Sequence, residues 1–196
     1  IVRGLRAYCS NRDRPMPTQP SQFAMILRKH LNNSRLVEVR QHGFDRVIQM
    51  DFEHGGGRLS LIIELFRDGN ILLLDQEGVI IRPLTHARYA SRSLKKGVAY
   101  TPPPEAIDPR KLSGGSLNEI LSSSDHALIR TLASRVNLGR IYGSAACSIA
   151  GIDEDAQSNS LTEEQKSSLG IALSKMLGNL DEGEGGNIWL SDPKSK

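Results

Sequence analysis

The chain has 196 residues, of which 38% are hydrophobic and 24% charged, a composition typical of a globular protein with a sizeable core. No apolar run approaches the roughly 18 residues that a membrane-spanning helix needs, so we expect no membrane segment. The net charge of +3 hides an asymmetry: residues 1–100 hold 16 Lys and Arg against 9 Asp and Glu, and residues 101–196 hold 9 against 13. A basic front half favours a polyanionic partner; an ordinary solvated surface is the alternative.

The first residue, the cysteines and the histidines further limit which kind of protein this can be. The first residue is Ile1, and no signal peptide is visible, so we expect a fragment of a longer protein. The two cysteines make a disulfide framework improbable, which favours the reducing cytoplasm. Cys9 and Cys147 are the only cysteines and form no CxxC motif, which excludes a cysteine-based zinc site. The five histidines show no ligand spacing, and we expect neither a metal nor another cofactor.

The first half of the chain predicts one helix followed by a β-meander. Ser21 can cap a helix whose apolar stripe is Phe23, Leu27 and Leu31. Alternating apolar residues separated by short turns then predict five strands, at residues 36–41, 47–53, 59–65, 71–74 and 79–81. Sequential strands on short turns are antiparallel, so this half should form a sheet or sandwich.

The second half predicts helices only, after a Pro-rich segment that ends near residue 108. The expected helix caps are Ser116 with Glu119, Ser124, and Thr162 with Gln165, and Gly151 should close a helix over residues 140–150. The residues from Asp181 onward are acidic and Gly-rich. We therefore predict an α+β protein with a β-rich domain at 1–108, an all-α domain at 109–180 and a mobile tail at 181–196.

The stretch "NLGRIYGSAACSIAGID" places a tight glycine turn at the start of a helix. Unpaired backbone N–H groups at Gly139 and the cation of Arg140 could hold a phosphate there. Plain packing is the alternative, because Gly143 and the small residues after it permit a close approach between helices.

Two further groups of basic residues are candidate contacts to a nucleic-acid backbone. Arg28 and Lys29 lie on the exposed side of the first helix, where a solvated face is the alternative. Residues 82–96 carry Arg88, Arg92, Lys95 and Lys96 without an acidic residue, and Tyr89 could stack on a base.

Asp45 and Arg46 stand side by side at the start of the second predicted strand. If the alternation extends back from that strand, Phe44, Arg46 and Ile48 share one face, and Arg46 lies on the core side. A guanidinium there needs an anion, either a buried carboxylate or a phosphate or base edge in a cleft. Asp45 could accept from base amino groups. The alternative is a salt bridge that caps the strand.

Part of the second half resembles the helix–two-turns–helix domain of formamidopyrimidine-DNA glycosylases. The matching residues are Leu138-Gly139-Arg140-Ile141-Tyr142, then Ala150-Gly151-Ile152, then Leu161-Thr162-Glu163-Glu164. The match departs at Arg140, where the glycosylases use Asn to hold a DNA phosphate. Their catalytic proline amine and their zinc finger have no counterpart in this sequence, so the resemblance implies nucleic-acid binding without base excision, and we expect no enzyme.

A second resemblance covers nearly the whole chain. The stretches "PSQFAMILRKHL", "RLVEVRQHGFDRV" and "FRDGNILLLD" are similar to the amino-terminal domain of the NFACT family, which includes RqcH, NEMF and the fibronectin-binding protein A-like proteins. That domain itself resembles the glycosylase fold followed by a helix–hairpin–helix domain. The two resemblances therefore agree on the fold class.

The NFACT resemblance implies a role in ribosome-associated quality control. Family members bind a large ribosomal subunit that holds a stalled peptidyl-tRNA, engage tRNA and promote carboxy-terminal tailing. The residues that match their tRNA-binding motif here are Asp45 and Arg46. The resemblance implies a binding module with no membrane and no small-molecule substrate. A glycosylase-like protein that binds damaged DNA is the alternative, and a fibronectin-binding adhesin is a third interpretation that no export signal, anchor or repeat supports.

Overall fold

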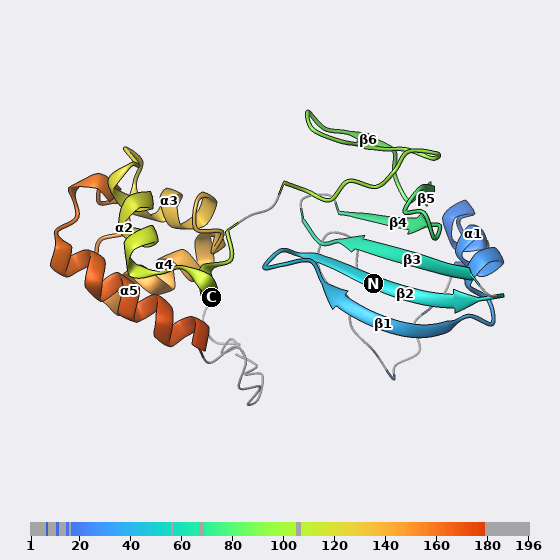
Figure 1. Cartoon of the computed structure of the whole chain (residues 1–196), viewed down its shortest axis with the longest axis horizontal. Helices are drawn as coiled ribbons and strands as arrows, with labels where there is room; N and C mark the ends of the chain where they lie inside the picture. The colour runs from blue at the N-terminus through green and yellow to red at the C-terminus, as the bar shows by residue number, and fades with distance from the viewer. Residues whose placement is uncertain are drawn as a thin grey trace. The chain divides into compact units, whose positions relative to one another are not determined.

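The computed structural model describes residues 17–178 except 56, 67–68 and 105–106, together with 7, 11 and 15. The chain divides into two compact units, residues 1–105 and residues 106–196 (Figure 1). The acidic and Gly-rich segment at 181–196, predicted to be a tail, lies outside the described residues.

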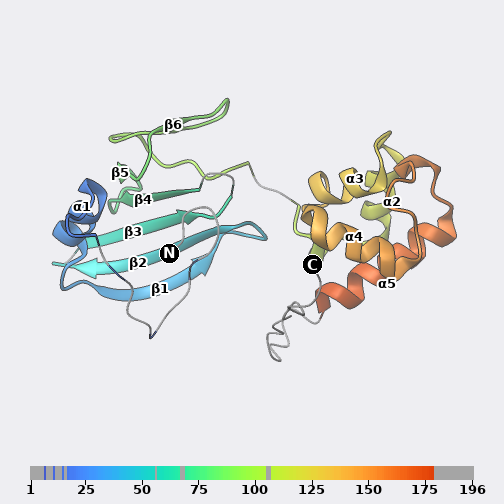
Figure 2. The same cartoon turned by 180° about the vertical axis from the view of Figure 1, so that it is seen from behind.

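The first unit opens with helix α1, Gln22–Leu31. Its cap is the predicted one, because the Ser21 side chain accepts a hydrogen bond from the Ala24 backbone N–H at 3.2 Å. Phe23 is the buried residue of the helix, and the last turn carries Arg28, Lys29 and His30. Helix α1 lies beside strand β5 (Figure 2). The Arg82 side chain of β5 donates to the Gln22 side chain of α1.

The five predicted strands are confirmed as one antiparallel meander in which each strand pairs with the next along the chain. They are β1 (Arg35–Gln41), β2 (Val47–His54), β3 (Gly57–Glu64), β4 (Asn70–Leu74) and β5 (Ile80–Pro83). A separate two-stranded hairpin follows, made of β6 (Ala87–Arg88) and β7 (Ser93–Leu94).

Both faces of the sheet bury apolar side chains. One face contributes Val47, Ile62, Leu72, Leu74 and Ile80 to a core that also includes Leu94 from β7, with Phe66, Ala87 and Tyr100 packed against it. Because side chains alternate along a strand, Leu61, Ile63 and Leu73 are buried on the other face. The β6–β7 hairpin therefore covers the first face, which we call the hairpin face.

The described part of the second unit contains helices and one isolated bridge, between Ala127 and Gln157. The helices are η1 (Pro109–Lys111), α2 (Gly114–Ser122), α3 (Leu128–Ser134), α4 (Gly139–Ala150), η2 (Ser158–Ser160) and α5 (Glu163–Gly178). Among the described residues, every helix is too short or too polar to cross a bilayer.

In the second unit, two of the predicted helix caps are confirmed and two are wrong. Thr162 and Gln165 form the reciprocal capping box, and Gly151 closes α4 with a φ of 67°. Helix α2 instead begins three residues earlier than expected, with Ser113 as its cap. Ser124 is buried and bonds to Thr131 of α3, so its hydroxyl joins two segments of the core and caps no helix.

Candidate nucleic-acid interface

The Asp45–Arg46 pair lies in the turn between β1 and β2. The turn is closed by a hydrogen bond from the His42 N–H to the Val47 carbonyl, and Gly43 takes a φ of 55°, which favours glycine. The Gln41 side-chain amide donates to the Asp45 carbonyl at 2.7 Å. The turn is thus held by hydrogen bonds between the end of β1 and the residues that lead into β2.

The prediction that Arg46 lies on the core side of the sheet is wrong. Val47 is the buried residue, at 2% exposed, and Arg46 is exposed. The alternation fails because the positive φ of Gly43 and the bends at 45–46 break the extended backbone before Val47.

The alternative, a salt bridge that caps the strand, is also not what holds this turn. The Asp45 carboxylate accepts from the Arg46 backbone N–H at 2.7 Å, and the Arg46 carbonyl accepts from the Leu65 N–H at 2.7 Å. In the part of the chain that the structure describes, no ion pair engages the Arg46 guanidinium. Its donors are available to a ligand, while its backbone is fixed to the sheet.

A buried ion pair lies directly behind this turn. Glu64, the cross-strand partner of Val47, accepts from both terminal guanidinium nitrogens of Arg92, and its side chain is 1% exposed. The Tyr100 hydroxyl donates to the same carboxylate at 3.1 Å. Burial and the negative charge of Glu64 raise the pKa of Tyr100 well above its ordinary value, so the phenol stays protonated.

Arg92 was predicted to contact a nucleic-acid backbone, and the structure gives it an internal partner. Burial alone would lower the pKa of Arg92, but the hydrogen bonds and charge of Glu64 outweigh burial and raise it. Sequence analysis missed Glu64 and Tyr100. A signal existed for Glu64, since an acidic residue two positions after Ile62 falls on the buried side of β3 and requires a cation.

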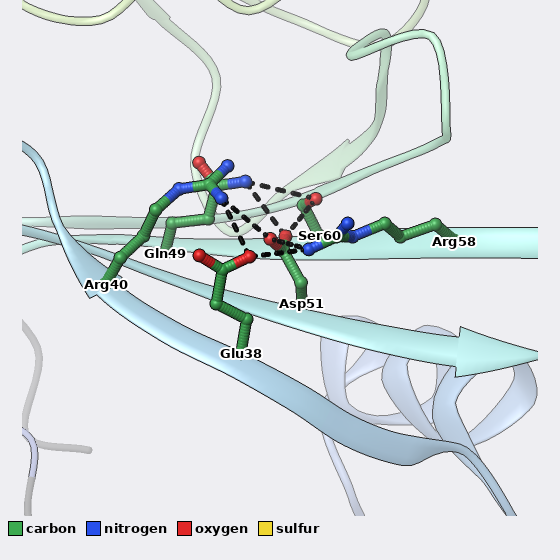
Figure 3. Close-up of polar contacts among 6 residues, drawn as sticks. All are labelled: Glu38, Arg40, Gln49, Asp51, Arg58 and Ser60. Atoms are coloured by element: carbon green, nitrogen blue, oxygen red, sulfur yellow. Dashed lines mark hydrogen bonds and ion pairs between the residues drawn. The ribbon is translucent and has the colours of Figure 1, made fainter.

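A second polar cluster lies at the other end of the hairpin face (Figure 3). Asp51, at 1% exposed, accepts from Gln49, Ser60 and Arg58 at 2.8, 2.5 and 2.8 Å. Arg40 lies 3.3 Å from Asp51, and Glu38 accepts from both Arg40 and Arg58.

These six residues join β1, β2 and β3, because register places Glu38 opposite Asp51 and Asp51 opposite Ser60. Burial alone would raise the pKa of Asp51, but hydrogen bonds from Gln49 and Ser60 and the charges of Arg40 and Arg58 outweigh burial and lower it. A cavity of about 370 Å³ borders the cluster. The cluster pairs two carboxylates with two guanidinium groups, so we assign it to holding the strands together.

The remaining predicted residues are distributed over both units. Arg28 and Lys29 are exposed in the last turn of α1, and Arg88 is exposed on β6. Lys95 and Lys96 are exposed in a turn whose Gly97 N–H donates to Ile80 of β5.

In the second unit, Gly139 begins α4 with a φ of 67°. Arg140 is 81% exposed and lies 3.7 Å from Glu154. No three His, Cys, Asp or Glu side chains gather to hold a metal ion within the described residues.

Comparisons with known proteins agree with one another. The archaeal Rqc2 homolog aRqcH of Methanocaldococcus jannaschii is 33% identical over 162 residues, which cover 80% of this chain and 24% of the relative. The ribosome quality control complex subunit NEMF of Homo sapiens is 42% identical over 84 residues, which cover 43% of this chain and 8% of the relative. The chain therefore spans about a quarter or less of the length of these relatives.

The chain also resembles a solved structure and matches a family model. The N-terminal part of the fibronectin/fibrinogen-binding protein from Streptococcus suis aligns with a TM-score of 0.59 and 26% identity, over 82% of this chain and 62% of that one. The model of the NFACT N-terminal and middle domains matches residues 2–196. With an antiparallel sheet, relatives named for ribosome quality control and a match over nearly its full length, the chain belongs to the NFACT family.

Proposed function

We propose that this chain is the tRNA-binding module of a ribosome-associated quality control factor that acts on stalled nascent chains. In this proposal it binds tRNA on a large ribosomal subunit that carries a stalled peptidyl-tRNA, and it supports carboxy-terminal tailing. The peptidyl-transfer chemistry belongs to the ribosome, so the chain is a binding module in the cytoplasm and not an enzyme.

The observation that carries the proposal is the exposed Arg46 guanidinium on a fixed turn. Its backbone is tied to Leu65, and its side chain has no ion-pair partner among the described residues. Because the guanidinium has no internal partner, it can donate to a phosphate or to a base edge without first breaking an ion pair, and the fixed backbone sets where the side chain starts. Asp45 keeps one carboxylate oxygen outside the hydrogen bond to the Arg46 N–H and can accept from a base amino group.

The exposed cations on the rest of the first unit would add backbone contacts without sequence preference. They are Arg28, Lys29, Arg88, Lys95 and Lys96. We further propose that residues 109–180 form a helix–hairpin–helix domain in which Gly139 and Arg140 contact a phosphate at the start of α4.

The test is equilibrium binding, by fluorescence anisotropy over a salt series, to tRNA and to duplex DNA with an abasic site. We expect tRNA to bind more tightly than the DNA. The double change Asp45→Ala/Arg46→Ala should weaken tRNA binding by at least roughly tenfold, because it removes base-edge contacts as well as a charge. The salt slope should fall by about one.

A matched control is Arg35→Ala, which removes an exposed arginine from β1 in the same sheet. It should change the tRNA affinity by less than about threefold, as expected for one non-specific charge. Tighter binding to the damaged DNA, unaffected by the double change, would instead favour the glycosylase-like alternative.

A further inference from the structure

The side chains of Phe66, Arg92 and Tyr89 form a stack beside the Asp45–Arg46 turn. The Arg92 guanidinium carbon lies 4.8 Å from the Tyr89 ring centroid and 5.8 Å from that of Phe66. Arg92 thus lies against both rings, and cation–π attraction strengthens where the cation is desolvated. We call these three residues the aromatic stack.

Hydrogen bonds to Arg92 and to the backbone of Tyr89 hold the aromatic stack in place. Glu64 holds both terminal nitrogens of Arg92, and the Thr101 carbonyl accepts from one of them at 3.3 Å. The Tyr89 N–H donates to the Arg92 carbonyl at 2.8 Å, which closes the turn between β6 and β7. Leu94 and Ala87 anchor the same hairpin in the core. Tyr89 is therefore held by its backbone and by its ring.

Tyr89 nevertheless stays 39% exposed. An exposed aromatic ring that is already immobilised loses little conformational entropy when a ligand stacks on it. Arg88, the preceding residue, is exposed and supplies a cation for a neighbouring phosphate. A flat ring beside a cation is the arrangement that binds unstacked bases of single-stranded nucleic acid.

The aromatic stack and the Asp45–Arg46 turn lie at the same end of the sheet. Glu64 is the cross-strand partner of Val47, and the next residue, Leu65, donates to the Arg46 carbonyl. The last residue of β3 therefore supports the aromatic stack through its side chain, and the residue after it supports the Asp45–Arg46 turn through its backbone.

We propose that Tyr89 is a stacking site for one unpaired nucleotide of RNA, and that Glu64 and Arg92 are positioning residues that hold its ring. This inference rests on the proposed function and specifies that the RNA must present an unpaired base at this end of the sheet. Bases inside a duplex have both faces covered by the neighbouring stacked pairs, so the site discriminates single-stranded RNA from the interior of duplex RNA.

The first experiment compares binding to tRNA, to a short single-stranded adenylate RNA and to a duplex RNA of the same length. Tyr89→Leu should weaken binding to tRNA and single-stranded RNA by roughly 5- to 150-fold, the loss expected for one base–aromatic stack. Binding to the duplex should change less than about twofold. Tyr89→Phe keeps the ring and should bind like the wild type.

Ile107→Ala is the matched control, since Ile107 is a large apolar residue of similar exposure, 41%, and lies outside the first unit. It should leave all three affinities unchanged. Thermal unfolding of each variant checks that a loss of binding does not come from a loss of fold.

A direct readout uses the single tryptophan of the sequence. Tyr89→Trp in a Trp189→Phe background places the sole indole at the proposed site. Single-stranded RNA should quench its emission, and duplex RNA should not. If Arg46→Ala weakens tRNA binding while Tyr89→Leu and the tryptophan emission show no effect, the stacking site is wrong and the proposed function stands. If single-stranded RNA quenches the tryptophan but tRNA does not bind, the proposed function fails and the stacking site stands.

Discussion

At the scale of single residues, the buried carboxylate of Glu64 has the largest expected effect on stability. Glu64→Gln would leave the Arg92 guanidinium buried without its counter-charge, which should cost about 3–5 kcal/mol of unfolding free energy. Glu53→Gln is the control, because Glu53 also pairs with an arginine, Arg35 at 2.8 Å, but both side chains are more than half exposed. It should cost at most about 1 kcal/mol. Urea unfolding measures the unfolding free energy of both variants. Equal losses would contradict the conclusion that Glu64 is the buried counter-charge of Arg92.

At the scale of elements, the cluster around Asp51 should make the attachment of β1 sensitive to acid. The folded-state pKa of Asp51 is lowered from 3.8, so its contribution to stability is present above pH 3.8 and is lost as the pH falls through the lower folded value. Unfolding free energies over this acidic range should decline less steeply for Asp51→Asn than for the wild type. Asp125→Asn removes an exposed carboxylate in the second unit and serves as the control. Its unfolding free energy should fall with pH as steeply as that of the wild type.

The packing of α3 against α4 gives a second test at this scale. A Cβ added at Gly143 would lie 3.0 Å from Ile129 Cδ1 and 3.4 Å from Leu132 Cβ, so Gly143→Ala should destabilise the second unit by about 1–3 kcal/mol. Gly170→Ala in α5 is the matched change, because its nearest neighbour is Leu117 Cδ2 at 3.9 Å. It should stabilise by up to about 1 kcal/mol through helix propensity. Thermal unfolding measures the stability change of each variant. If both changes stabilise the protein, or both destabilise it, the packing argument is wrong.

At the scale of the whole molecule, patterns that depend on local periodicity were predictable and long-range pairings were not. The five strands, the Ser21 cap and the Thr162–Gln165 box follow from residues that are close in sequence. The partner of Arg92 is 28 residues away, and the role of Ser124 depends on α3, so neither could be derived from spacing. Arg46 was misplaced because the turn extends through Arg46, so the alternation begins at Val47 and does not reach back to Phe44 as the pattern assumed.

The exposed strand β1 has a consequence for how the protein behaves at high concentration. Among the described strands it is the last on its side of the sheet, and Leu36, Val37 and Val39 are all more than a third exposed. Such an edge invites pairing with the same strand of another molecule. The register shift between Leu36 and Glu38 and the charges of Arg35, Glu38 and Arg40 oppose that pairing. The ion pairs that fasten β1 to the sheet therefore also protect the molecule from self-association.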